Sequence, residues 1–174
     1  MDIEVFKDSV VVFVKNNEAW AAPIVFLLAF GESLAFVSLV LPATVILVGI
    51  GGLIGVSGID LWPVWCAGVV GSILGYAVSY WVGLIYRDHI HAFWPFSSNP
   101  TMIPRGRAFF DKYGAAGVFL GHFFGPLRAV VPVVAGMCAM RQFPFQVANV
   151  SASLLWTTAM ILPGAFGMKW LIGG

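Results

Sequence analysis

Three long uncharged stretches, residues 33–59, 62–86 and 143–168, dominate this sequence. Each is longer than the ~20 residues that an α-helix needs to cross a hydrocarbon core of about 30 Å. Charged residues make up only 10% of the 174 residues, whereas an ordinary soluble domain has roughly 25%. The stretches therefore predict an integral membrane protein that crosses the bilayer several times.

The stretches differ in how well they suit one continuous helix. Residues 62–86 and 143–168 contain no charge, and we expect each to form a plain spanning helix. Residues 19–59 are instead divided by Glu32, and the run that follows is broken by Pro42, Gly49, Gly51 and Gly52. We expect an interrupted element there rather than one continuous helix.

The second half of the chain repeats this pattern. Glu32 stands ten residues before Pro42, and His122 stands ten residues before Pro132. In both halves a glycine precedes the polar residue and a full-length apolar stretch follows the proline. Two interrupted hydrophobic segments at corresponding places indicate a transporter whose site lies at the interface between two repeats.

We predict one membrane domain, residues 1–174, built from four parts. Residues 1–18 suit an interfacial helix because their apolar side chains gather on one face. A first repeat (19–86), a polar connection (87–112) and a second repeat (113–174) follow. A hairpin that begins and ends on the same side of the membrane adds no net crossing, so the spanning helix that follows it gives each repeat an odd number of crossings. The two repeats therefore have opposite orientations in the membrane. The predicted fold is an all-α integral membrane protein with two broken, re-entrant helical hairpins, each followed by a spanning helix.

Three ionisable residues lie inside apolar sequence: Glu32, His122 and Arg128. A charged side chain at the bilayer centre costs about 2.5–3.5 kcal/mol, so such residues need partners or water. The planar donor fork of arginine fits a phosphate or a carboxylate. Glu32 can take up a proton, or it can pair with Arg128 in a structural ion pair that joins the halves.

Prolines indicate where a polar pocket can form at membrane depth. Broken helices expose backbone N–H and C=O groups, which are tolerated there only where protein or water satisfies them. Pro42, Pro126 and Pro132 mark such positions, and the N-terminal ends of half-helices would add amide donors for an anion. His122 suits an ordinary hydrogen-bonded core as well as it suits an anion site.

No cofactor, metal site or catalytic centre is predicted. Cys66 and Cys138 stand alone in apolar segments, where we expect them to pack. His89 and His91 lack a third ligand close by, which favours a solvated loop. A net charge of +1 offers no basic patch for nucleic acid. An enzyme is not expected, because no nucleophile and base stand at a readable spacing.

Small residues recur at every fourth position of the stretch 62–86, namely Ala67, Gly71, Gly75, Ser79 and Gly83. This small-residue ridge allows another helix backbone to approach closely. It can serve as the seam of a homo-oligomer or as a packing face within the chain, and packing within the chain is the stronger expectation.

Several segments together resemble the DedA family of membrane proteins. Residues 109–156, FFDKYGAAGVFLGHFFGPLRAVVPVVAGMCAMRQFPFQVANVSASLLW, resemble its signature half. GSILGYAVSYWVG resembles its glycine-rich helix and GESLAFVSLVLPA its first broken segment, so the likeness covers nearly all of residues 20–165. It implies two re-entrant hairpins that face each other. It also implies transport of phospholipids or lipid carriers such as undecaprenyl phosphate, with proton or cation coupling.

The resemblance also assigns roles to single residues. It implies that Glu32 is the acid that opens the first hairpin and Arg128 the second arginine of the signature, with Pro42 and Pro132 as hairpin prolines. The chain departs from the family at three positions, where arginine, a second acid and aspartate are replaced by His122, Thr44 and Tyr76. Protonated His122 can substitute for the arginine, and phosphate binding would then depend on pH.

These observations predict a multi-pass transporter or flippase of the bacterial inner membrane for a phosphate-bearing lipid, undecaprenyl phosphate or a phospholipid. We expect Arg128 and His122 to bind the headgroup and Glu32 to couple transport to protons, around a pocket formed by Pro42, Thr44, Pro126 and Pro132. Membrane lipids and a proton or cation are the expected partners, and a homo-oligomer stays open. The alternatives are a proton or cation antiporter with Glu32 as the ion site, and a non-transporting membrane scaffold.

Overall fold

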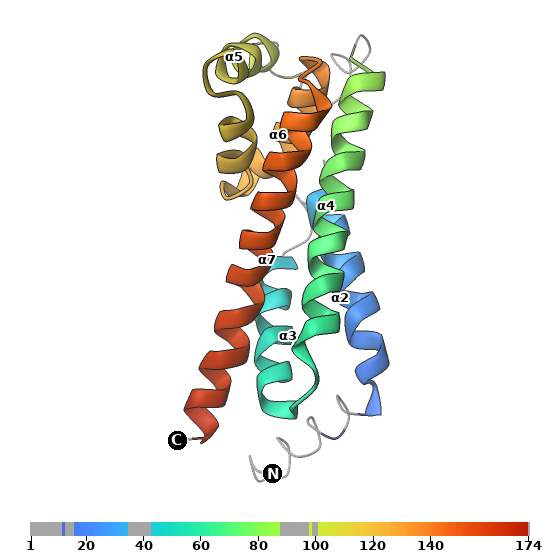
Figure 1. Cartoon of the computed structure of the whole chain (residues 1–174), viewed down its shortest axis with the longest axis vertical. Coiled ribbons are helices and arrows are strands. Elements are labelled where there is room, and N and C mark those ends of the chain that lie inside the picture. The colour runs from blue at the N-terminus through green and yellow to red at the C-terminus, as the bar shows by residue number, and fades with distance from the viewer. Residues whose placement is uncertain (1–11, 13–15, 35–42, 88–97, 99–100, 174) are drawn as a thin grey trace.

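The computed structural model describes residues 12, 16–34, 43–87, 98 and 101–173 (Figure 1). Six helices lie in this part of the chain: α2 (Glu18–Ser33), α3 (Ala43–Ser57), α4 (Leu61–Ile85), α5 (Met102–Gly121), α6 (Gly125–Met137) and α7 (Gln142–Gly173). The predicted all-α fold is confirmed for these residues. The predicted interfacial helix at residues 1–18 falls almost wholly outside them.

Two helices, α4 and α7, are long and apolar enough to cross a membrane. They correspond to the stretches 62–86 and 143–168, so both predicted spanning helices are confirmed by length and composition. The carboxylate of Asp60 accepts a hydrogen bond from the backbone N–H of Trp62 at 3.1 Å and thereby caps the start of α4. In Figure 1, α7 runs nearly the full height of the molecule, and α4 runs beside it from the top to below the middle.

Three helices are shorter than a membrane crossing. α2, α3 and α6 have 16, 15 and 13 residues, which gives lengths of about 20–24 Å against a core of about 30 Å. In Figure 1, α2 and α3 lie beside the lower half of α4 and α7, whereas α5 and α6 lie beside the upper half.

α2 ends at Ser33, directly after Glu32, where the sequence predicts an interruption. The break expected at Pro42 lies outside the described residues, and the glycines that follow do not interrupt the helix. α3 runs without a break through Gly49, Gly51 and Gly52, so the prediction of a break at these residues is wrong. A Cβ atom at Gly51 would collide with the backbone carbonyl of Ile161, and one at Gly55 with that of Ala165. Glycine therefore serves here to bring the backbone of α3 against α7.

The small-residue ridge of α4 is covered within the chain. A Cβ atom at Gly71 would lie 2.5 Å from the carbonyl oxygen of Phe26, and one at Gly75 would lie 2.5 Å from that of Phe30. Further along α4, Gly83 faces the backbone of Val133 on α6. The ridge is therefore a packing face for α2 and α6, and these three glycines are not exposed for an oligomer seam.

Each of the two spanning helices packs against two of the other four helices. α2 and α6 pack against α4, whereas α3 and α5 pack against α7. One apolar cluster, around Tyr80, Val133 and Phe145, joins α4 and α7 to α5 and α6. A second cluster, around Val25 and Leu47, joins them to α2 and α3.

A sharp bend divides α5 into two parts. Gly114 has φ 50° and ψ −130°, a conformation that glycine adopts far more readily than other residues. Residues 102–113 form the part before the bend, and residues 115–121 form the part that descends beside α6 (Figure 1). The end of the predicted polar connection is therefore helical.

Candidate functional site

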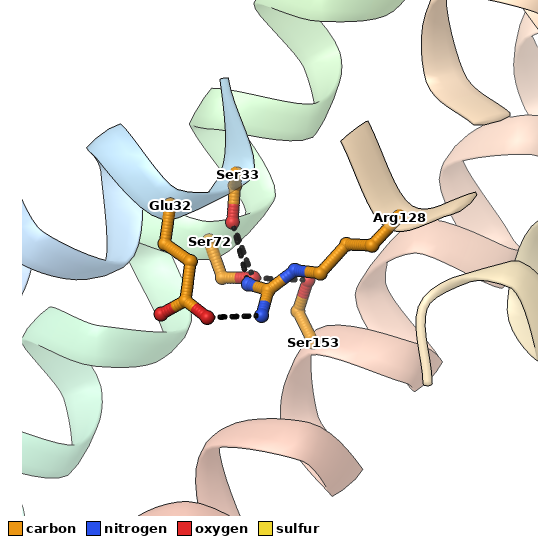
Figure 2. A network of polar contacts seen from close by, with 5 residues as sticks. All are labelled: Glu32, Ser33, Ser72, Arg128 and Ser153. Atoms are coloured by element: carbon orange, nitrogen blue, oxygen red, sulfur yellow. Dashed lines mark hydrogen bonds and ion pairs between the residues drawn. The ribbon is translucent and has the colours of Figure 1, made fainter. Parts of the chain in front are cut away.

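The end of α2 and the start of α6 meet at a buried polar centre, which comprises Glu32, Ser33, Ser72, Arg128 and Ser153 (Figure 2). Glu32 and Arg128 are only 6% and 4% exposed. α6 begins at Gly125 with a proline in its first turn, a position where the fixed φ of proline suits a helix start. The centre thus lies where two short helices end between the spanning helices.

The guanidinium of Arg128 is held by residues from the other half of the chain. Its Nη1 lies 3.0 Å from Oε1 of Glu32, and its Nη2 donates to the hydroxyl of Ser33 at 3.1 Å. Figure 2 shows the arginine reaching across to the end of α2. The ion pair that we weighed as a structural link between the halves is therefore present.

A chain of hydroxyl groups extends the polar centre to both spanning helices. Ser33 donates to Ser72 on α4 at 3.2 Å, and Ser72 donates to Ser153 on α7 at 3.1 Å. Ser153 in turn donates to the side-chain oxygen of Asn149 at 3.3 Å, and the amide of Asn149 donates to the carbonyl of Ile73 at 3.0 Å. Hydrogen bonds thus tie α2, α4 and α7 together around Arg128.

His122 and Arg128, the two predicted headgroup ligands, both contact the aromatic ring of Trp156. The guanidinium carbon of Arg128 is 3.8 Å from the centre of the Trp156 ring, and the His122 ring is 6.0 Å from it. His122 also packs on Tyr76 with 4.4 Å between ring centres. Both His122 and Tyr76 are completely buried.

Several buried polar atoms in and around the centre have no hydrogen-bond partner among the described residues. Among the described residues, no hydrogen-bond partner reaches either nitrogen of His122, the hydroxyl of Tyr76 or Nε of Arg128. Buried polar groups in proteins are nearly always hydrogen-bonded to protein or to water. These atoms are therefore placed to form hydrogen bonds with water or to donate hydrogen bonds to the oxygens of a ligand.

The predicted pocket prolines and threonine are only partly described. Pro42 lies outside the described residues, and Thr44 and Pro126 lie in α3 and α6 with side chains that are not described. Pro132 is fully buried, and α6 continues through it. Of the two cysteines, Cys138 is partly buried and Cys66 is exposed, so Cys66 does not pack in the interior as expected.

The serines and Trp156 were not predicted, although the sequence holds signals for them. Asn149, Ser153 and Thr157 recur at every fourth residue of α7, a spacing that puts polar groups on one face of an apolar helix. Tryptophan in a spanning helix is enriched at the membrane interfaces, whereas Trp156 stands near the middle of α7. Both features mark a helix face that is not exposed to lipid.

Comparisons with known proteins agree with this architecture. The family model of the VTT domain matches residues 41–166. Inner membrane protein YabI of Escherichia coli (strain K12) is 33% identical over 152 residues, which cover 87% of this chain and 60% of YabI. An uncharacterized membrane protein of Buchnera aphidicola subsp. Baizongia pistaciae (strain Bp) is 30% identical over 154 residues, 88% of this chain and 60% of that protein.

A third relative carries the name of the family that the sequence resembles. Protein DedA of Escherichia coli (strain K12) is 28% identical over 156 residues, 84% of this chain and 68% of DedA. The chain spans about 60% of the length of YabI and of the Buchnera protein. No solved structure matches it. The chain belongs to the VTT-domain family of membrane proteins, the family of DedA and YabI, and is a multi-pass protein of the inner membrane.

Proposed function

We propose that this protein is a transporter that carries a phosphate-bearing lipid, undecaprenyl phosphate or a phospholipid, across the inner membrane, and that it is not an enzyme. The observation that carries the proposal is the buried fork of Arg128, held by Glu32 from the other half of the chain at 3.0 Å. An arginine buried at membrane depth is costly and usually serves an ion or substrate pathway.

In this proposal α2 with α3, and α5 with α6, are the two re-entrant hairpins of an inverted repeat. Helices α2, α3 and α6, with 16, 15 and 13 residues, are too short to cross the membrane alone. Their positions beside opposite halves of α4 and α7 in Figure 1 support the assignment. The headgroup would pass between the hairpin tips while the hydrocarbon chains stay in the lipid.

Glu32 controls access to Arg128 in this mechanism. A phosphate binds best to the two parallel donors of the guanidinium fork, and both terminal nitrogens of that fork are engaged by Glu32 and Ser33. Protonation of Glu32 removes the negative charge that holds the fork. Proton uptake would therefore release Arg128 for the phosphate, and deprotonation would displace the phosphate.

His122 and Tyr76 would complete the headgroup site. Their unmatched polar atoms lie beside Arg128 and Trp156, where they can donate hydrogen bonds to phosphate oxygens. A second positive charge on His122 is repelled by Arg128 unless an anion lies close to both residues. Phosphate binding and protonation of His122 should therefore favour each other.

An ion pair with a purely structural role is the plainer explanation of Glu32 and Arg128. Desolvation of two buried charges often exceeds their attraction, so such a pair is weak evidence for a stabilising function. The unmatched polar atoms of His122, Tyr76 and Arg128 favour a ligand instead. A proton or cation antiporter with Glu32 as the ion site is the second candidate, because it needs the same buried carboxylate.

Reconstitution into liposomes separates these functions. We expect fluorescent polyprenyl phosphate or fluorescent phosphatidylglycerol to become accessible to an impermeant quencher from the opposite leaflet, at a rate that depends on an imposed pH gradient. Glu32→Gln and Arg128→Lys should abolish this movement, because the first removes the titrating group and the second removes the planar fork.

Matched controls come from exposed residues of the same types. Glu18→Gln on α2 and Arg141→Lys before α7 should move lipid like the wild type. Proton or cation flux without lipid movement would replace the proposal with the antiporter. Absence of both activities in folded protein would favour the scaffold.

A further inference from the structure

A hollow of about 620 Å³ lies between α5 and α6, apart from the polar centre. Its volume falls in the range of about 300–1,000 Å³ that is usual for small-molecule sites. Arg105 lies in its wall, together with apolar and aromatic residues that include Phe109, Tyr113, Leu120, Phe124 and Val131. We refer to this hollow as the α5–α6 groove.

The bend at Gly114 creates the groove. It folds the first part of α5 over the second, so that a Cβ atom at Gly117 would lie 2.5 Å from the Phe109 ring. Near the tip, a Cβ atom at Gly121 would lie 2.6 Å from Val131 of α6. The two parts of α5 touch at the first point, and α5 touches α6 at the second. The groove lies between these contacts.

The lining of the groove combines one positively charged residue with apolar side chains. Arg105 is exposed in the part of α5 that precedes the bend, next to the similarly exposed Arg107. Leu120 in the descending part and Phe124, directly before α6, are 49% and 59% exposed. Exposed apolar side chains are ordinary on a membrane protein. A hollow with an apolar lining and one arginine in its wall suits a ligand that has an apolar chain and an anionic group.

We infer that the α5–α6 groove binds one acyl chain of an anionic phospholipid whose phosphate lies against Arg105. The descending part of α5, residues 115–121, is about 10 Å long at 1.5 Å per residue. One leaflet of a core of about 30 Å is about 15 Å deep. The groove therefore covers about two thirds of the depth of one leaflet. That length suits part of a single acyl chain, which favours a phospholipid over a much longer polyprenyl chain.

This phospholipid site does not depend on the proposed transport. Gly121 lines the deep end of the groove and directly precedes His122, so a bound lipid would lie next to the polar centre. Binding in the groove can be measured without any movement of lipid. A failure of one proposal therefore leaves the other intact.

Photo-crosslinking tests the site directly. The whole purified chain is incubated in detergent with phosphatidylglycerol that carries a diazirine in one acyl chain, and labelled peptides are identified by mass spectrometry. We expect labels concentrated on the peptides that hold Phe109, Tyr113, Leu120 and Phe124. Arg105→Gln should lower the labelling several-fold, whereas Arg107→Gln, which removes the same charge outside the groove, should leave it unchanged.

Three results would overturn the inference. The first is labelling spread evenly over the exposed apolar residues of α4 and α7, such as Val78 and Leu155, because that pattern describes ordinary surrounding lipid. The second is an equal effect of Arg105→Gln and Arg107→Gln in protein that elutes normally on gel filtration. The third is displacement of the probe by polyprenyl phosphate more strongly than by unlabelled phosphatidylglycerol, which would reject the phospholipid as occupant.

Discussion

Arg128 lies over Trp156, with its guanidinium carbon 3.8 Å from the centre of the ring. Its terminal nitrogens meanwhile contact Glu32 and Ser33. The arginine is therefore held by an aromatic face from α7 and by polar groups from α2. A cation over an aromatic face in a desolvated setting is worth about 2 kcal/mol or more.

Replacement of Trp156 should destabilise the protein strongly. Trp156→Leu removes the aromatic face and leaves a cavity, so we expect a loss of about 2–4 kcal/mol. Trp156→Phe retains a ring and should lose less. Thermal melting in detergent measures both changes. The control is Trp81→Leu, because Trp81 is 51% exposed, and a large loss there together with a small one at Trp156 would contradict the role of the contact.

Glu32 and Arg128 should show strong energetic coupling. Glu32→Gln leaves a buried unpaired charge on Arg128, which typically costs about 3–5 kcal/mol. Glu32→Gln combined with Arg128→Met removes both charges and should be less destabilising than the sum of the two single changes. The coupling is expected at about 0.5–3 kcal/mol and is read from four melting curves. Strict additivity would mean that the two side chains do not interact in the membrane protein.

Two neighbouring glycines of α3 should respond in opposite ways to alanine. A Cβ atom at Gly51 would collide with the backbone of Ile161, whereas one at Gly49 would meet no atom within 4 Å. Gly51→Ala should therefore lower the yield of folded protein and its melting temperature. Gly49→Ala should be neutral or stabilising by up to ~1 kcal/mol, because alanine favours helix. Equal tolerance at both sites would show that α3 does not pack closely on α7.

Headgroup binding should strengthen as pH falls through the titration range of His122. Protonated His122 adds a positive charge beside Arg128 that a bound phosphate offsets. The other titratable residues around it, Glu32 and Tyr76, are unchanged in a His122→Gln variant. That variant should bind more weakly at acid pH and show a flatter profile, and His122→Arg should hold binding at alkaline pH. Binding measured against pH for the three proteins tests this, and three identical profiles would remove His122 from the site.

The membrane-spanning framework could be predicted from the sequence because hydropathy depends on composition and length alone. The end of α2 at Ser33 was likewise indicated by Glu32, which interrupts the apolar sequence there, whereas Pro42 lies outside the described residues. Glu32 and Arg128 could be singled out because a charge in apolar sequence needs a partner. Gly49, Gly51 and Gly52 were misread because glycine can mark a break or a close helix contact, and only the position of α7 decides between them.

Other features depend on contacts that the order of residues does not specify. The serines at positions 33, 72 and 153 are ordinary residues in apolar helices until three helices bring their hydroxyls within hydrogen-bond distance. The α5–α6 groove follows from the backbone conformation of Gly114, whose φ of 50° is not implied by its neighbours. The sequence thus indicated which charged residues are buried, whereas the hydroxyl groups around Arg128 and the groove depend on how the helices pack.

The packing of α3 and α6 on spanning helices from the opposite half of the chain has a consequence for biosynthesis. α3 belongs to the first half of the chain but packs on α7, which the ribosome makes after α3 to α6. Likewise α6, from the second half, packs on α4 of the first. The glycine face of α3 has its packing partner only in α7, so the nascent first half must wait in the membrane with this face uncovered until α7 has been made.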